Sequence, residues 1–179
     1  MAESTAIEWC DSTLNPWIGC DRISPGCDGC YAAVSTPART LGVVWGPREQ
    51  RHRTAESTRH ALRRYERGQA HFFAQHGRSR RVFVASLSDV FDNAAPQAWR
   101  DDLWADCLLS PRVNKLVLTK RIGNVRRMVP SRWLTNGWPA HVWLGISVVH
   151  REEMLRDASK LAELPVAALR QIYALTAVT

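Results

Sequence analysis

The sequence lacks any apolar run near eighteen residues, so no ordinary membrane-spanning helix is expected. It also lacks a basic and then apolar leader before Ile7, which argues against a secretory signal. Without a secretory context, the five cysteines are expected to be reduced thiols of a cytoplasmic protein rather than disulfides. The histidines at 52, 60, 71 and 76 lack the spacing typical of metal ligands and are interpreted as surface or packing residues.

Lysine is scarce as well, because only three of the 24 basic residues are lysine and 21 are arginine. The formal net charge of +7 is concentrated in residues 48–81, which hold ten arginines against three glutamates. We expect an arginine-rich insertion containing a helix, and a clustered arginine surface predicts contact with the phosphates of nucleic acid. The alternative is a solvated basic face, since arginine is the common base throughout this chain.

What the sequence does contain is a cysteine-rich loop. Three cysteines are spaced C-x6-C-x2-C, at Cys20, Cys27 and Cys30. Three glycines punctuate the same stretch, at Gly19, Gly26 and Gly29. Glycines let the backbone approach a bulky inorganic centre, and three thiolates leave a coordination position open, whereas a structural zinc site closes with four ligands. The pattern therefore predicts a reactive metal or cluster, and Cys10 is either a fourth ligand or a buried, idle thiol.

The rest of the chain alternates short apolar runs with amphipathic segments. Strands are predicted at 82–86, 113–118 and 141–148, and helices from about 96, over 122–129 and over 152–164. This spacing indicates βα units around a parallel sheet, in a single domain over residues 1–179. Before it, a helix over 54–67 is expected to end at Gly68, and one over 31–39 to be broken at Pro37. Cys107 falls on the apolar face of its helix, which predicts a core residue.

Polar residues follow each predicted strand. The sets are Ser86, Ser88 and Asp89; Thr119, Lys120 and Arg121; and Ser147 and His150. In parallel α/β folds the carboxyl ends of the strands gather the functional groups, so these residues are expected around the cysteine loop. For Ser88, Asp89 and Asp92 a helix cap or turn role is an equal alternative.

Several segments together resemble the phage Gp37/Gp68 family of unknown function, which is related to the radical S-adenosylmethionine enzymes. The matching segments are WCDSTLNPWIGC at 9–20, SPGCDGCYA at 24–32, SLSDVFD at 86–92, LTKR at 118–121 and VWLGISV at 142–148. The resemblance implies a partial parallel (βα) barrel whose C-terminal part is truncated, with a change of pattern near residue 167. The cysteine spacing departs from the common radical-enzyme loop, C-x3-C-x2-C, and Tyr31 follows the last cysteine instead of preceding it.

The resemblance also implies cofactors. Cys20, Cys27 and Cys30 are expected to bind a [4Fe-4S] cluster, with S-adenosylmethionine on the fourth iron. Tyr31, Ser86, Ser88 and Asp89 are expected to contact S-adenosylmethionine. The chain would then cleave this cofactor reductively and act on a substrate that no motif identifies, with a nucleic acid favoured by the arginines. The electron donor and the oligomeric state are equally unspecified.

Two alternatives stay open beside this enzyme. One is a zinc-binding module for nucleic acid, with Cys10, Cys20, Cys27 and Cys30 as four ligands next to the arginine-rich segment. The other is an inactive, truncated remnant of the enzyme family, with an unpaired strand edge and exposed apolar helix faces.

Overall fold

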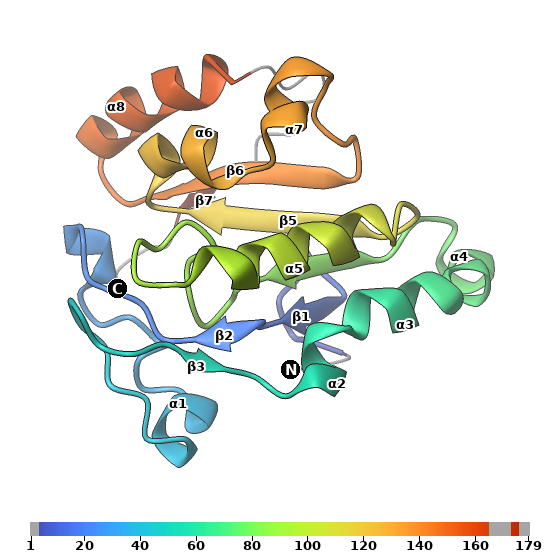
Figure 1. The fold of residues 1–179 in the computed structure, drawn as a ribbon, viewed down its shortest axis with the longest axis horizontal. Coiled ribbons are helices and arrows are strands. Elements are labelled where there is room, and N and C mark those ends of the chain that lie inside the picture. Colours follow the sequence, from blue (N-terminus) through green and yellow to red (C-terminus); the bar gives the residue numbers. More distant parts are fainter. Residues whose placement is uncertain (1–3, 165–172, 176–179) are drawn as a thin grey trace.

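The fold is built on a parallel β-sheet (Figure 1). The structure is a computed structural model, which describes residues 4–164 and 173–175 of the chain. The five strands of the sheet lie in the order β1-β4-β5-β6-β7, and every neighbouring pair is parallel. Their bounds are Ser12–Leu14, Arg81–Val84, Asn114–Thr119, Val142–Val148 and Tyr173–Leu175. The predicted α/β class with a parallel sheet is confirmed. The sheet is open between β1 and β7, so the described residues form no barrel.

The central strands form where the sequence is apolar on both faces. Val82, Leu116 and Leu144, from β4, β5 and β6, are almost completely buried. Val82 and Leu144 lie on the face that packs against the helices, and Leu116 lies on the opposite face, so both faces of these strands are removed from water. The predicted strand at 82–86 ends two residues early because Ala85 adopts a left-handed backbone conformation with φ 65°.

Helices cover the sheet. The helix α5, Gln97–Leu108, shares one apolar core with β4 and β5, and Cys107 is fully buried there as predicted. The helix α8, Arg151–Ala162, packs against β6 and against the short helix η2, Ile122–Asn124, which leads into α6, Val125–Met128. A further short helix, α7, spans Ser131–Thr135, and its Trp133 joins the same core.

The helix predictions over residues 31–39 and 54–67 were wrong in their boundaries. Pro37 lies in the first turn of α1, Thr36–Thr40, after the N-cap Ser35, so it begins a helix instead of breaking one. The segment predicted as one helix contains α2, Glu56–Arg59, and α3, Ala61–Arg67. Gly68 has φ −85° and leads directly into α4, Gln69–His76, whereas Gly77 supplies the left-handed stop.

A second, two-stranded sheet leads into the cysteine loop. Strand β2, Trp17–Ile18, pairs antiparallel with β3, His52–Arg53, so the arginine-rich segment begins beside the entry to that loop. Inside the loop, the 3-10 helix η1 spans Pro25–Cys27. Among the described residues no helix combines the length and the apolar character needed to cross a membrane. The change of pattern expected near residue 167 lies outside the described residues.

Candidate functional site

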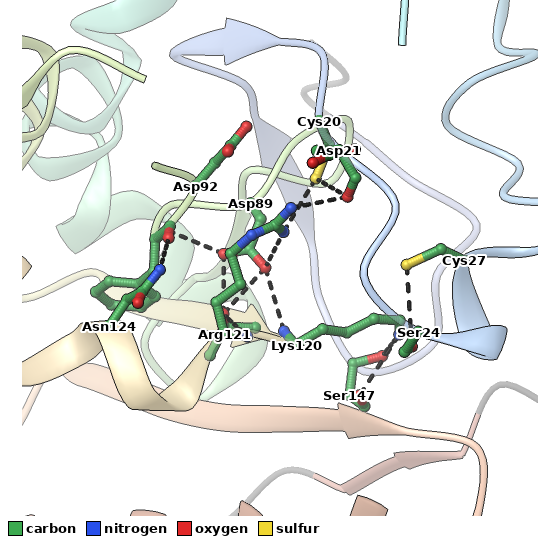
Figure 2. A network of polar contacts seen from close by, with 12 residues as sticks. Cys20, Asp21, Ser24, Cys27, Asp89, Asp92, Lys120, Arg121, Asn124 and Ser147 are labelled. Atoms are coloured by element: carbon green, nitrogen blue, oxygen red, sulfur yellow. Dashed lines mark hydrogen bonds and ion pairs between the residues drawn. The ribbon is translucent and has the colours of Figure 1, made fainter. Parts of the chain in front are cut away.

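The cysteine loop lies against the carboxyl ends of β5 and β6 (Figure 2). Gly26 marks the closest approach, because a Cβ atom there would come within 2.9 Å of both methyl carbons of Val149 and 3.4 Å of Lys120 Cε. A glycine is therefore required by packing at this position. The turn is closed by the backbone N–H of Cys27, which donates to the carbonyl of Ser24 at 2.9 Å.

Arg121 is the residue that joins the loop to the sheet. Its Nη1 donates to Cys20 Sγ at 3.2 Å, and its Nη2 donates to the carbonyl of Asp21 at 2.7 Å. Burial raises the pKa of the Cys20 thiol to about 12, while the positive charge of Arg121 acts in the opposite direction. Arg121 itself is almost completely buried. The arrangement provides a fixed cation for any negative charge that develops on Cys20.

Asp89 holds Arg121 in place. Its carboxylate accepts from Thr119 Oγ1 at 2.9 Å, from the backbone N–H of Phe91 at 2.9 Å and from Arg121 Nη1 at 3.2 Å. The backbone N–H of Lys120 adds a fourth donor at 3.2 Å. Both oxygens of this buried carboxylate are engaged, so Asp89 ties the end of β4 to the end of β5 and has little capacity for a further ligand.

On the side of the loop that faces β6 lie Cys27 of the loop and Lys120, which follows β5. Cys27 Sγ lies 4.0 Å from Ser24 Oγ, and Lys120 Nζ donates to Ser147 Oγ at 2.5 Å (Figure 2). The residues that the strand-end argument placed around the loop, Lys120, Arg121 and Ser147, do lie beside it. His150 instead precedes the first turn of α8 as its N-cap residue.

Cys30 and Tyr31 lie over the end of β4. Cys30 packs on an apolar cluster that includes Ile18 and Leu87. The exposed Tyr31 donates its hydroxyl hydrogen to the carbonyl of Ser86 at 2.7 Å, and burial of the hydroxyl raises its pKa. Ser86 Oγ is in turn hydrogen-bonded to the side chain of Asn15 at 3.0 Å. Tyr31 and Ser86 therefore hold the end of the loop on β4.

Ser88 differs from the other predicted cofactor contacts. Its Oγ is buried and has no hydrogen-bond partner among the described residues. An unpaired buried hydroxyl is unfavourable by about 1–3 kcal/mol, so this group is suited to receive a ligand. It lies next to the loop, since Ser88 and Gly19 form an isolated parallel bridge.

Whether a metal or cluster fits depends on how the thiols are placed. All five cysteines are free; Cys20, Cys27 and Cys30 are partly exposed, whereas Cys10 and Cys107 are buried. Three partly exposed thiols on one loop are the type of ligand that an iron–sulfur cluster takes. In the described part of the chain, however, no three side chains of the metal-binding types lie together as a ligand set. Binding would therefore require the loop to bring its sulfur atoms together.

Cys10 is separated from this loop by the fold. It precedes β1, and the next residue, Asp11, bonds through its backbone N–H to the carbonyl of Arg81 at the start of β4. Burial raises the pKa of the Cys10 thiol to about 11. These features are those of a buried, idle thiol that is not part of the loop.

Several arginines of the arginine-rich segment make contacts within the chain. Arg51 pairs with Asp92 inside the protein at 2.6 Å, and Arg80 stacks over the ring of Phe72 with its Cζ atom 4.3 Å from the ring centroid. Three more arginines are ion-paired with carboxylates: Arg53 with Asp102, Arg63 with Asp106 and Arg78 with Asp11. Half of the ten arginines of residues 48–81 therefore have a partner within the chain, and among the four ion-paired ones only Arg51 is buried.

Sequence reasoning missed two parts of this site. Asn15 was interpreted only as a turn residue before Pro16, yet its side chain also accepts from the backbone N–H of Leu87 at 2.7 Å. The left-handed Ala85, directly before Ser86, carried no sequence signal because alanine rarely adopts this conformation. The Thr119-Lys120-Arg121 run did signal the strand end, but not that Arg121 would contact Cys20.

Comparison with known proteins identifies a family and no function. No curated protein and no solved structure matches the chain. A family model with the description "Protein of unknown function (DUF5131)" matches residues 4–174. Because this match covers nearly the whole sequence, the chain belongs to that family of proteins of unknown function.

Proposed function

We propose that the chain is an iron–sulfur protein of the radical S-adenosylmethionine type, with Cys20, Cys27 and Cys30 as the ligands of a [4Fe-4S] cluster. The observation that carries the proposal is the position of these three thiols. They are the partly exposed cysteines, they share one loop, and the loop lies against the carboxyl ends of parallel strands, where α/β enzymes place their chemistry.

The residues around the thiols have separate roles in this proposal. Arg121 donates to Cys20 Sγ and favours its thiolate form, and Asp89 positions Arg121. Ser88 Oγ and the exposed ring of Tyr31 are the groups that remain able to contact S-adenosylmethionine. Ser86 and Asp89 are bound within the protein, so we assign them positioning roles.

When bound, a cluster of this type would supply the electron that cleaves S-adenosylmethionine reductively. The chain's own part is to hold the thiols, to keep Arg121 beside Cys20 and to limit the access of water. The open parallel sheet supports the finer expectation of a partial barrel, because four of its strands run β1-β4-β5-β6 with helices between β4, β5 and β6. The substrate remains unassigned in this proposal.

A four-cysteine zinc site is less well supported. It would need Cys10, which is buried and precedes β1, to join the three loop cysteines, and no such ligand set is present among the described residues. The internal pairing of the arginine-rich segment also reduces the basic surface that such a nucleic-acid module would use. An inactive remnant of the enzyme family would bind the cluster but would not cleave S-adenosylmethionine. The experiment below therefore distinguishes a remnant from an active enzyme.

The test is anaerobic purification and reconstitution, followed by iron, sulfide and zinc analysis and an electron paramagnetic resonance spectrum of the reduced protein. We expect about four irons per chain and a cluster signal that changes when S-adenosylmethionine is added. Release of 5′-deoxyadenosine would then separate an active enzyme from a remnant, which would hold the cluster without cleaving the cofactor.

Single Cys→Ala variants supply the controls. Replacing Cys20, Cys27 or Cys30 should remove the cluster, whereas Cys10→Ala should keep it if the variant folds, as checked by circular dichroism. Normal iron binding in a chain lacking all three loop cysteines would contradict the proposal. Zinc bound without iron, and lost on Cys10→Ala, would favour the zinc module instead.

A further inference from the structure

An open depression of about 380 Å³ lies beside the cysteine loop, between η2 and α8. Ile23 of the loop forms one wall, Gly123 and Asn124 of η2 another, and residues of α8 a third. Arg121 and Asn124, both labelled in Figure 2, are among its lining residues. A Cβ atom at Gly123 would meet nothing within 4 Å, so the backbone there is open to a ligand.

The charged side chains of this depression are mostly positive. Four cations line it against one lining carboxylate, that of Asp157, while Asp89 pairs with Arg121 and Glu153 lies near Lys120 from outside the lining. The four are Lys120, Arg121, Arg156 and Lys160. A cleft lined by one sign of charge concentrates ions of the opposite sign. The depression is therefore suited to an anion with several negative charges.

Both lysines keep hydrogen-bonding capacity, as does Arg156, which uses two of its five N–H donors. Arg156 directs Nε and Nη2 at Asp157, at 2.8 and 2.7 Å, and Arg121 is engaged with Asp89 and the cysteine loop. Among the described residues Lys120 Nζ donates to Ser147 alone, with the charge of Glu153 nearby, and Lys160 Nζ has one long contact to Asp157, at 3.4 Å. An ammonium group has three donors, so each lysine retains at least one.

The placement of lysine is itself informative in a chain with 21 arginines. Of the three lysines, Lys115 is buried in the sheet, and the other two both line this depression. Arginine is the cation that this sequence uses elsewhere for ion pairs within the fold. Lysine presents a compact charge on a flexible stem, which suits a phosphate group that binds as a point charge.

We propose that this depression binds a polyphosphate group, as carried by a nucleoside diphosphate or by inorganic pyrophosphate, through Lys120 and Lys160. Its volume is in the range of sites for small ligands, and its excess of positive charge matches the charge of such a group. The site does not depend on the proposed cluster. Because Arg121 borders both, a bound ligand lies next to the residue that contacts Cys20.

The test is isothermal titration calorimetry of the full chain with pyrophosphate, ADP and AMP at low and high salt. We expect pyrophosphate to bind, AMP to bind more weakly, and affinity to fall with salt. Lys160→Gln should weaken pyrophosphate binding about tenfold, the scale of one charge-assisted hydrogen bond, and Lys120→Gln by a similar factor. ADP binding more tightly than pyrophosphate would identify a nucleotide, and the reverse order a free polyphosphate.

Arg151→Gln is the matched control, because Arg151 lies on the exposed surface of the same helix, loses the same charge and does not line the depression. Its affinity for pyrophosphate should equal that of the unmodified protein. Equal weakening by Arg151→Gln and Lys160→Gln, or no binding of pyrophosphate at millimolar concentration, would overturn the proposal. A short thymidine oligonucleotide that binds more tightly than ADP through the same lysines would also overturn it, in favour of nucleic acid.

Discussion

Lys115 shows how far a residue's surroundings can shift its chemistry. The side chain is completely buried under α5, where its Nζ donates to the carbonyls of Cys107, at 3.0 Å, and of Ser110. Burial lowers the pKa of Lys115 to about 8. In the unfolded chain the ammonium keeps its ordinary pKa of about 10.5, so the folded state binds the proton more weakly.

This difference predicts a pH-dependent stability. Below about pH 8 the Lys115 amine is protonated in both the folded and the unfolded state, and the buried charge lowers the free energy of unfolding by its full amount. As the pH rises from about 8 to about 10.5, the amine loses its proton in the folded state first, so the free energy of unfolding increases. The increase is on the order of 3 kcal/mol. Urea unfolding of the unmodified chain and of Lys115→Met across this range should show the rise only with the lysine. Parallel pH profiles would show that the amine is not the group responsible.

Two glycines of the cysteine loop are needed for different reasons, one for the local backbone conformation and one for packing against a distant residue. Gly29 has φ 65°, a left-handed backbone conformation that by itself favours glycine. Gly26 has no positive φ, and its small size is needed because Val149 lies against it. Val149 is 123 positions away in the sequence, so this requirement could not be predicted from the loop alone.

At the scale of elements, α4 and its flanking glycines give a matched pair of predictions. Gly77→Ala should destabilise the protein by about 1 kcal/mol, because Gly77 has φ 65° and alanine strains there even though nothing lies within 4 Å. Gly68→Ala should be neutral or stabilising, because Gly68 has φ −85° and its nearest atoms lie at 3.8 Å or beyond. Urea midpoints measure both; equal losses would contradict the assignment of Gly77 as the helix stop.

Elements with a strong local signal were predicted and the others were not. The helices at α5 and α8 and the strands β4, β5 and β6 follow from their periodicity and apolar runs, with boundaries within two residues. Strands β2 and β3 have two residues each, and they exist only because they pair with each other. The position of Pro37 was misjudged because Ser35, which accepts from the backbone N–H of Ala38, makes a helix start there.

At the scale of the whole molecule, the buried pair of Arg51 and Asp92 connects the arginine-rich segment to the loop after β4. The Arg51 side chain is fully buried, and its Nε donates to Asp92 at 2.6 Å. Asp92→Asn would leave that charge unpaired and should destabilise the protein by about 3 kcal/mol or more. Asp28→Asn is the control, because its pair with Arg22 is exposed and should contribute nothing measurable. Thermal unfolding compares the two; equal effects would contradict the structural role of Arg51.

The sequence by itself determined the α/β class, the central strands and helices, the grouping of three cysteines in one loop and the set of polar residues at the strand ends, because each depends on spacing along the chain. Tertiary structure decided which of those polar residues touch a thiol, which arginines are internal, and that two lysines face one depression. These outcomes depend on packing between segments distant in sequence. Arg121 illustrates the difference, since only folding brings it to Cys20, 101 positions earlier.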